Sequence, residues 1–196
     1  MKRKLLLLTI LFAGLVQISF AQLLDDSTQV KFFFFGGAEY MPSNKYDNLS
    51  FLEIAGGLNI QGVEIIGKGR SMISKTNYSN DTIPSSQINI TYGSIGVGYI
   101  FMDEKKISPF LQGGFSIGNI SLSKEETYSG NTYISTIKSD EISELYLEGG
   151  IDISINWWLE VRIGARYNTV YGLELLDLQA KDFSGISGWG GLKFNF

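Results

Sequence analysis

The sequence predicts an all-β protein, an eight-stranded antiparallel up-and-down β-barrel, preceded by a cleaved signal peptide. Three observations support this prediction. The N-terminus combines basic residues with a long apolar run. The rest of the chain alternates apolar and polar residues with a period of two, in segments of roughly ten residues. Its 23 glycines and three prolines suit a chain of many strands with few breaks.

The N-terminus has the pattern of a secretory signal peptide. Three basic residues follow the first methionine, and a predominantly apolar run continues to Phe20. The run is shorter than the ~20 apolar residues that a membrane-spanning helix needs, so we favour cleavage over an uncleaved anchor. Small residues flank Phe20 and favour cleavage between Ala21 and Gln22. We therefore expect residues 1–21 to be the signal peptide and residues 22–196 to form the barrel domain.

Charge and composition exclude several functions. The formal net charge is −4, and removal of the three basic signal residues leaves −7, which argues against a nucleic-acid partner. The chain contains no cysteine and no histidine. Disulfides, the Ser-His-Asp triad and the usual histidine-ligated zinc sites are therefore excluded. We expect no catalytic residues, no cofactor and no metal site.

Alternation is clearest over residues 145–157. Leu145, Leu147 and Ile151 share one face, whereas Glu148 and Asp152 share the other. A strand with one apolar and one charged face is buried on one side only. The eight expected strands span residues 29–41, 50–60, 63–77, 87–101, 107–122, 141–156, 158–172 and 185–196.

The fourth expected strand has an irregular pattern. Ile88 and Ile90 fall on a different face from Ile95 and Val97. If all these apolar side chains point to one side, the strand needs a phase change or a β-bulge near Tyr92.

The connections between the expected strands alternate in length. Short turns at one end of a barrel and long loops at the other are the outer-membrane arrangement, with both termini in the periplasm. The expected short connections are residues 61–62, 102–106 and a tight turn near 156–157, and the long ones are residues 42–49, 78–86, 123–140 and 173–184.

Alternation alone does not say which face points into the barrel. A soluble, lipocalin-like barrel would put its apolar face inside, whereas a transmembrane β-barrel turns that face to lipid. Aromatic residues near the strand ends favour the membrane, because such residues form girdles at the two membrane interfaces. The expected girdle residues are Tyr40, Tyr99, Phe101, Trp157, Trp158, Phe194 and Phe196.

The signal peptide, the eight alternating segments and a last strand that ends in Phe196 resemble a known family. They are similar to the small eight-stranded outer-membrane proteins of the OmpA/OmpX type, in particular the PorT-like outer membrane protein β-barrel domain group. The resemblance covers residues 22–196 and brings no catalytic motif. It implies a location in the outer membrane, contact with outer-membrane lipid, and recognition of the C-terminal strand by the barrel insertion machinery.

The polar faces of a membrane barrel meet in its lumen, which eight strands make only wide enough for side chains to fill. Six acids and six bases are expected there, and near-balance is what a closed, low-dielectric interior demands. We favour a salt-bridge plug over an ion or proton path. Glu148 and Asp152 lie about 13 Å apart along one strand, too far for a shared catalytic centre, and opposing arginines explain them better. The expected lumen charges are Lys31, Glu39, Glu53, Glu64, Lys68, Arg70, Glu148, Asp152, Glu160, Arg162, Arg166 and Lys193.

The long connection at residues 123–140 is the strongest candidate for a partner site. Ser129, Gly130 and Asn131 form a turn signal between β-prone flanks, so the neighbouring strands are expected to extend past the membrane as a ribbon. Its exposed edge is a template for a protein partner, although an inert surface hairpin is equally compatible with the pattern. We expect a structural or surface-interaction role. The alternatives are a small channel or transporter and a soluble periplasmic lipid-binding barrel.

Overall fold

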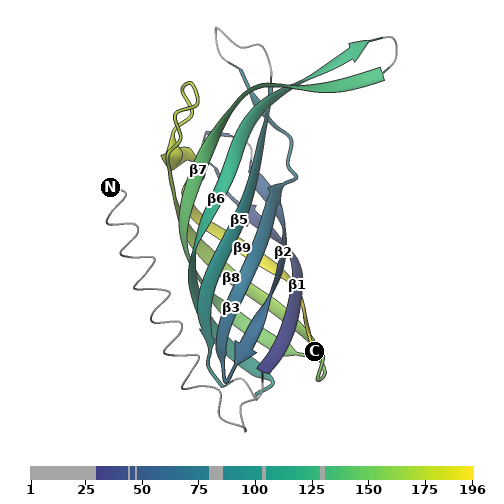
Figure 1. Ribbon diagram of the computed structural model, residues 1–196, viewed down its shortest axis with the longest axis vertical. Helices are drawn as coiled ribbons and strands as arrows, with labels where there is room; N and C mark the ends of the chain where they lie inside the picture. Colours follow the sequence, from purple (N-terminus) through teal and green to yellow (C-terminus); the bar gives the residue numbers. More distant parts are fainter. Residues whose placement is uncertain (1–29, 44, 47, 80–85, 103–104, 129–130) are drawn as a thin grey trace.

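The chain folds into one antiparallel sheet that closes on itself as a barrel (Figure 1). The computed structural model describes residues 30–43, 45–46, 48–79, 86–102, 105–128 and 131–196. The predicted signal peptide, with its cleavage site at Ala21 and Gln22, lies outside these residues. The described elements are β1 (Val30–Met41), β2 (Leu49–Ile60), β3 (Val63–Met72), β4 (Thr76–Tyr78), β5 (Ser86–Ile100), β6 (Ile107–Tyr128), β7 (Asn131–Ser154), β8 (Leu159–Tyr171), the 3₁₀ turn η1 (Ala180–Phe183) and β9 (Gly185–Asn195).

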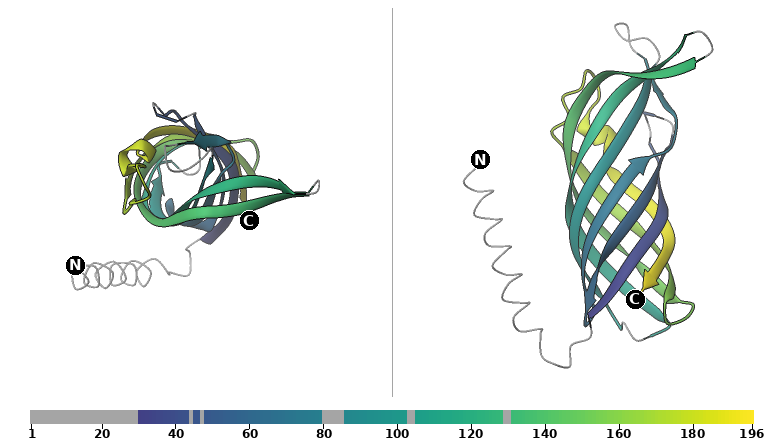
Figure 2. Two further views of the ribbon diagram at one scale, coloured as in Figure 1. Left: turned by 90° about the horizontal axis from the view of Figure 1, so that it is seen from above. Right: turned by 45° about the vertical axis from the view of Figure 1, so that its right-hand side comes forward.

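Eight of the nine described strands form the ring. The sheet order is β3-β2-β1-β9-β8-β7-β6-β5-β4, and pairing of β3 with β5 closes it. Figure 2 shows the ring from above. The backbone of Phe196 exchanges hydrogen bonds of 2.8 and 3.2 Å with that of Phe32, so the last residue of the chain extends the seam between β9 and β1. The prediction of an all-β, eight-stranded up-and-down barrel is confirmed.

The two ends of the barrel differ in the length of their connections. At one end the strands are joined by short segments such as residues 61–62 and 155–158, and the C-terminus lies there (Figure 1). We call this the turn end. At the other end, the loop end, longer connections join β1 to β2 and β8 to β9, and the β6–β7 hairpin extends beyond the barrel. No helix among the described residues is long and apolar enough to cross a membrane.

The third expected strand, residues 63–77, is interrupted. β3 ends at Met72, and β4 resumes the pairing with β5 at Thr76. Ser71 pairs with Thr91 and Thr76 pairs with Ile88, so the four residues 72–75 face the two residues 89–90. The extra residues form an irregularity of the β-bulge type. It is stabilised from β2, because the backbone N–H groups of residues 73 and 74 donate to Ser50 O at 2.8 and 3.4 Å.

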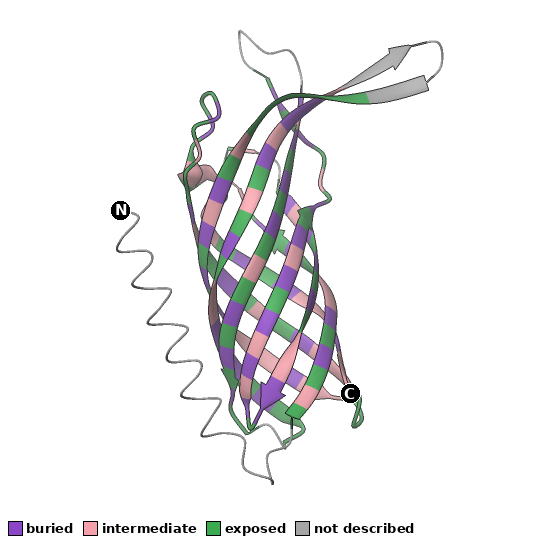
Figure 3. Ribbon diagram, in the orientation of Figure 1, coloured by how far each residue is buried: buried purple, intermediate pink, exposed green. Residues whose placement is uncertain are grey.

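Burial alternates along the strands, as the banding in Figure 3 shows. The exposed side chains on the barrel wall are mainly apolar, among them Leu52, Leu111 and Leu147, whereas the charged faces of the strands point inward. This is the reverse of a soluble lipocalin-like barrel, which carries its apolar face inside.

The predicted phase change in β5 was wrong. Its register with β6 runs without a shift from Gln87 opposite Ser123 to Ile100 opposite Phe110. Ile88, Ile90 and Tyr92 are buried inside the barrel, whereas Ile95 and Val97 are exposed on its outer wall. The prediction failed because it assumed that every apolar side chain points outward. In the protein, the lumen near the loop end is itself apolar.

The lumen is filled in layers. Along β7 the inward residues from the loop end to the turn end include Ile142, Glu144, Tyr146, Glu148 and Asp152, so an apolar layer precedes the charged ones. The apolar layer at the loop end is a cluster of buried side chains from the strands and from the β8–β9 connection. A second, smaller apolar layer contains Phe33, Phe35, Ala55, Ile66, Ile100, Phe110 and Trp189.

Candidate functional site

The lumen contains a first group of ion pairs, which we call the central cluster. Its members are Glu39, Glu53, Lys68, Arg70, Glu144, Glu148 and Arg166. Arg166 donates to Glu39 at 2.6 Å, to Glu53 at 2.5 Å and to Glu148 at 2.9 Å. Arg70 donates to Glu39 at 2.9 Å and to Glu144 at 2.5 Å. Lys68 is paired with Glu148. These contacts join strands on opposite sides of the barrel and fill the space between them.

A second group of ion pairs, the turn-end cluster, lies nearer the short connections. It contains Glu64, Asp152, Glu160, Arg162 and Lys193. Arg162 holds Asp152 with two hydrogen bonds of 2.6 Å and reaches Glu64 at 2.9 Å. Lys193 lies 2.8 Å from Glu64, 3.2 Å from Asp152 and 3.2 Å from Glu160. Paired, hydrogen-bonded charges of this kind are the form in which charges tolerate burial.

Ten of the twelve expected lumen charges are buried, and the other two, Lys31 and Glu160, are partly exposed near the turn end. The sequence predicted that arginines oppose Glu148 and Asp152 without naming them; in the β7–β8 register, Arg166 faces Glu148 and Arg162 faces Asp152. The expected set omitted Glu144, which is buried and accepts hydrogen bonds from Arg70, Ser116 and Asn168. Glu144 lies four residues before Glu148 on β7, so the alternation of the strand puts both on the same face. This pattern could have identified Glu144 from the sequence.

Aromatic rings complete the surroundings of the buried cations. The guanidinium of Arg70 lies 4.3 Å from the Tyr92 ring, and that of Arg162 lies 4.5 Å from the Phe110 ring. Phe35 packs edge-on against Trp189, which also contacts Phe110, in the apolar layer between the two clusters. The two clusters lie on either side of this layer, and their carboxylates are paired with cationic side chains.

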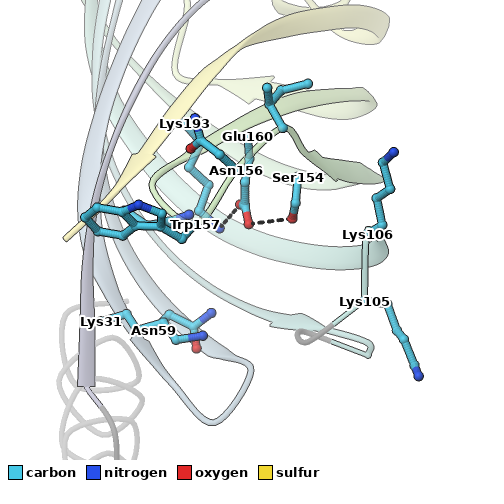
Figure 4. Close-up of a pocket in the computed structure, with 11 residues that line it drawn as sticks. Lys31, Asn59, Lys105, Lys106, Ser154, Asn156, Trp157, Glu160 and Lys193 are labelled. Carbon is cyan, nitrogen blue, oxygen red and sulfur yellow. Dashed lines mark hydrogen bonds and ion pairs between the residues drawn. The ribbon is translucent and has the colours of Figure 1, made fainter.

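The lumen opens at the turn end into a cavity of about 590 Å³ (Figure 4). Lys31 and Asn59 line one side and Lys106 another, while Trp157 lies at the rim. Glu160 accepts a hydrogen bond of 3.2 Å from Ser154 at the inner side of this cavity. Solvent reaches the edge of the turn-end cluster through this opening, but Arg162 and Lys193 above it are buried.

The expected girdle residues lie near the strand ends on the outer wall. Tyr40 is exposed near the loop end of β1. Near the turn end, Tyr99 and Phe101 pack edge to face, and Trp158 stacks on the half-buried Phe194. Trp157 and Phe196 are the most exposed of the set, at 84% and 77%. Tyr171, exposed at the loop end of β8, was absent from the expected set.

The β6–β7 hairpin projects from the loop end and leans away from the barrel axis (Figures 1 and 2). Pairing continues to Tyr128 opposite Asn131, with a register shift between residues 122 and 123. β5 pairs with β6 only as far as Ser123, and β8 pairs with β7 only from Ser143 onward. Between these limits the paired residues form a two-stranded ribbon, as expected of the β-prone flanks, whereas residues 129 and 130 of the turn signal lie outside the described residues.

No protein-family model matches the chain, and no curated protein matches its sequence. Solved structures do resemble it. Neisserial surface protein A aligns with a TM-score of 0.56 at 15% identity, over 87% of this chain and 99% of its own. Ail, the attachment invasion locus protein of Yersinia pestis, solved in complex with the heparin analogue sucrose octasulfate, aligns with a TM-score of 0.50 at 15% identity, over 85% and 98% of the two chains. The chain thus has the fold of small outer-membrane β-barrel proteins.

Proposed function

We propose that the protein is an integral outer-membrane barrel with a surface-interaction role, and that the β6–β7 ribbon binds a partner polypeptide. The observation that carries the interaction is the ribbon itself, which extends past the strands that flank it in the barrel. The chain offers no histidine or cysteine for catalysis, which supports a binding role over an enzymatic one.

Membrane insertion is supported by the outer wall. Its exposed side chains include Phe32, Ile54, Ile95, Leu111 and Ile163, which would form a large apolar surface in water. The charged faces, by contrast, are paired inside. With aromatic side chains at both ends of this surface, the wall has the composition of a lipid-facing belt.

We place the turn end, with both ends of the barrel domain, in the periplasm and the loop end outside the cell. Short periplasmic turns and longer outer loops are the usual arrangement in such barrels. The last strand, β9, ends in alternating apolar residues and pairs with β1 along the closing seam. We propose that the insertion machinery recognises this strand.

The ribbon is suited to β-augmentation, in which a partner adds an extended strand to a free sheet edge. Residues 134–139 of β7 are exposed and precede the pairing with β8. Ile134 and Ile137 are exposed apolar side chains in this segment, at 71% and 41%. Backbone groups of the edge would supply affinity, and these two side chains would supply specificity.

A photo-reactive amino acid at Ile134 tests the proposal on intact cells, with the same group at the lipid-facing Leu147 as the matched control. We expect a discrete cross-linked polypeptide from position 134 and none from position 147. Absence of any discrete adduct at position 134 would argue against a protein partner.

Proline substitutions then separate backbone pairing from side-chain contact. Consecutive N–H groups of a strand point to opposite edges, so Ser135→Pro and Thr136→Pro remove donors from different sides of β7. We expect the proline at the outer edge to abolish the adduct, while alanine at the same position preserves it. Equal loss with alanine would mean that side chains, and not the backbone edge, bind the partner.

A further inference from the structure

The connection between β8 and β9 packs against the loop end of the lumen. Residues 173–184, which we call the strap, follow β8 and include the 3₁₀ turn η1. Three of its side chains are buried: Leu175, Leu178 and Phe183 are 1%, 3% and 2% exposed. They belong to the same apolar cluster as the inward residues of the strands, so the strap packs into one side of the barrel mouth.

The wall beneath the strap is mainly aliphatic, although Phe51, Tyr78 and Tyr92 belong to the same cluster. Leu49, Ile88, Ile120, Ile142 and Val170, from five different strands, are each at most 3% exposed and pack in this cluster. Most apolar side chains of this cluster belong to strands of the barrel wall. The strap, by contrast, is a connection between two strands. Withdrawal of the strap would therefore leave an apolar cup at the mouth of the barrel.

Polar contacts at the rim fasten the strap to neighbouring segments. Lys45, from the β1–β2 connection, lies 2.9 Å from Asp182 and donates to the backbone O of Asp177 at 3.3 Å. The Tyr78 hydroxyl donates to the Asp177 carboxylate. The ring of Tyr46 stacks on Phe183 with centroids 5.5 Å apart. We call the contacts of Lys45 and Tyr78 with the strap the latch.

The latch is charged at neutral pH. The hydrogen bond to Asp182 raises the pKa of Lys45 above its ordinary value of 10.5. A raised pKa means that this contact is present below the ordinary value and is lost as the pH rises through the folded-state value. The Lys45 side chain is 43% exposed, whereas that of Asp182 is 9% exposed, so solvent reaches this ion pair from the lysine side.

The strap also touches the central cluster. Asn168 Nδ2 donates to the backbone O of Phe183 at 3.1 Å and to Glu144 at 2.9 Å. At the next residue of the strap, the Val170 N–H donates to Ser184 Oγ at 2.8 Å. The Asn168 amide thus connects the strap to the central cluster. The C-terminal end of the strap is held by hydrogen bonds to β8.

We propose that the strap is a gate: its apolar side chains seal the loop end of the lumen, and release of the latch exposes the apolar cup while the ion-pair clusters below remain closed. The gate goes beyond the proposed ribbon function and does not depend on it. Because the cup is mainly aliphatic, the solutes it would admit are small and apolar.

Cysteine accessibility tests the gate directly, since the chain has no native cysteine. A single Ile120→Cys substitution puts a thiol on the fully buried wall, and a charged thiol reagent in detergent reports its exposure. We expect slow labelling in the otherwise unchanged protein. Lys45→Ala should raise the rate by up to about fivefold, the range for loss of an exposed ion pair. Lys181→Ala is the matched control, because this lysine lies on the strap and its side chain is not in the latch; it should leave the rate unchanged.

A second variant keeps the test decisive. Replacing Leu175, Leu178 and Phe183 by serine removes the seal itself and should make Ile120→Cys label far faster than the latch variant does. Heat-modifiable migration on a gel verifies that each variant is a closed barrel. The gate is wrong if folded Lys45→Ala and the triple variant both label as slowly as the parent, or if the parent thiol is already freely reactive.

Discussion

Arg166 shows how a single residue organises the lumen. Its guanidinium serves three carboxylates, Glu39, Glu53 and Glu148, from three other strands. The sequence identified all four residues as inward by their position in the alternation, because the parity of a strand is a local property. It did not reveal which acid pairs with which base, since those contacts depend on how strands far apart in sequence face each other across the barrel.

Arg166→Met should destabilise the barrel by about 3–5 kcal/mol, because three buried carboxylates lose their shared cationic partner. Guanidinium unfolding in detergent, followed by gel migration, measures the change. Lys138→Met, on the exposed ribbon, is the control and should stay within about 0.5 kcal/mol. A small effect at Arg166 would indicate that the cluster is hydrated or rearranges readily.

The neighbouring glycines Gly149 and Gly150 should respond differently to the same change. A Cβ on the inward Gly150 would lie 2.0 Å from Ile163 O, whereas one on the outward Gly149 would meet nothing closer than 3.5 Å. Gly150→Ala should therefore cost about 1–3 kcal/mol, as overpacking does, and Gly149→Ala much less. Equal unfolding midpoints for the two variants would contradict the close approach of β7 and β8.

At the scale of the element, the period of two predicted the strands well, with errors where the environment changes along a strand. β5 keeps one register while its inward face passes from Ile88 and Ile90 to the small residues Ser94 and Gly96. The sequence shows where the polarity of the inward face changes along the strand. It does not show that this change follows the layers of the lumen and needs no bulge in the strand. The interruption between β3 and β4 has a similar origin, because it depends on backbone contacts with Ser50.

The ribbon should be separable from the barrel. Replacing residues 124–135 by an Asn-Gly turn joins Ser123 to Thr136, which are paired in the hairpin. The thermal unfolding of the barrel should be unchanged within error, because the removed residues lie beyond the pairing with β5 and β8. A large loss of stability would mean that the ribbon packs on the loops and is part of the folded core.

At the scale of the whole molecule, composition and alternation were sufficient for a closed barrel, whereas the contacts between its connections were not predictable. Lys45 and Asp182 meet although they are 137 residues apart in the sequence. No period or motif connects them, because the contact arises only when the barrel brings its first and last loops together. The strap was expected merely as a long polar connection, and its three buried apolar side chains are what that expectation missed.

Arginine on the outer wall tests the membrane placement. Leu147→Arg should cost about 2–4 kcal/mol in lipid, since it puts a charge near the middle of the apolar surface. Ile134→Arg, on the ribbon, should be nearly neutral. If both variants refold equally well without detergent or lipid, the wall does not face a membrane.

The layered filling of the lumen has a consequence for the cell that carries the protein. A barrier against leakage depends on every pore in it, and we expect a barrel filled in turn by apolar and charged layers to add no conductive path. Planar-bilayer recordings should stay at the lipid baseline, and discrete steps would instead favour the channel alternative. If each copy adds no leak, the number of copies in the membrane is not limited by permeability. It can then be as high as the contacts of the protein outside the cell require.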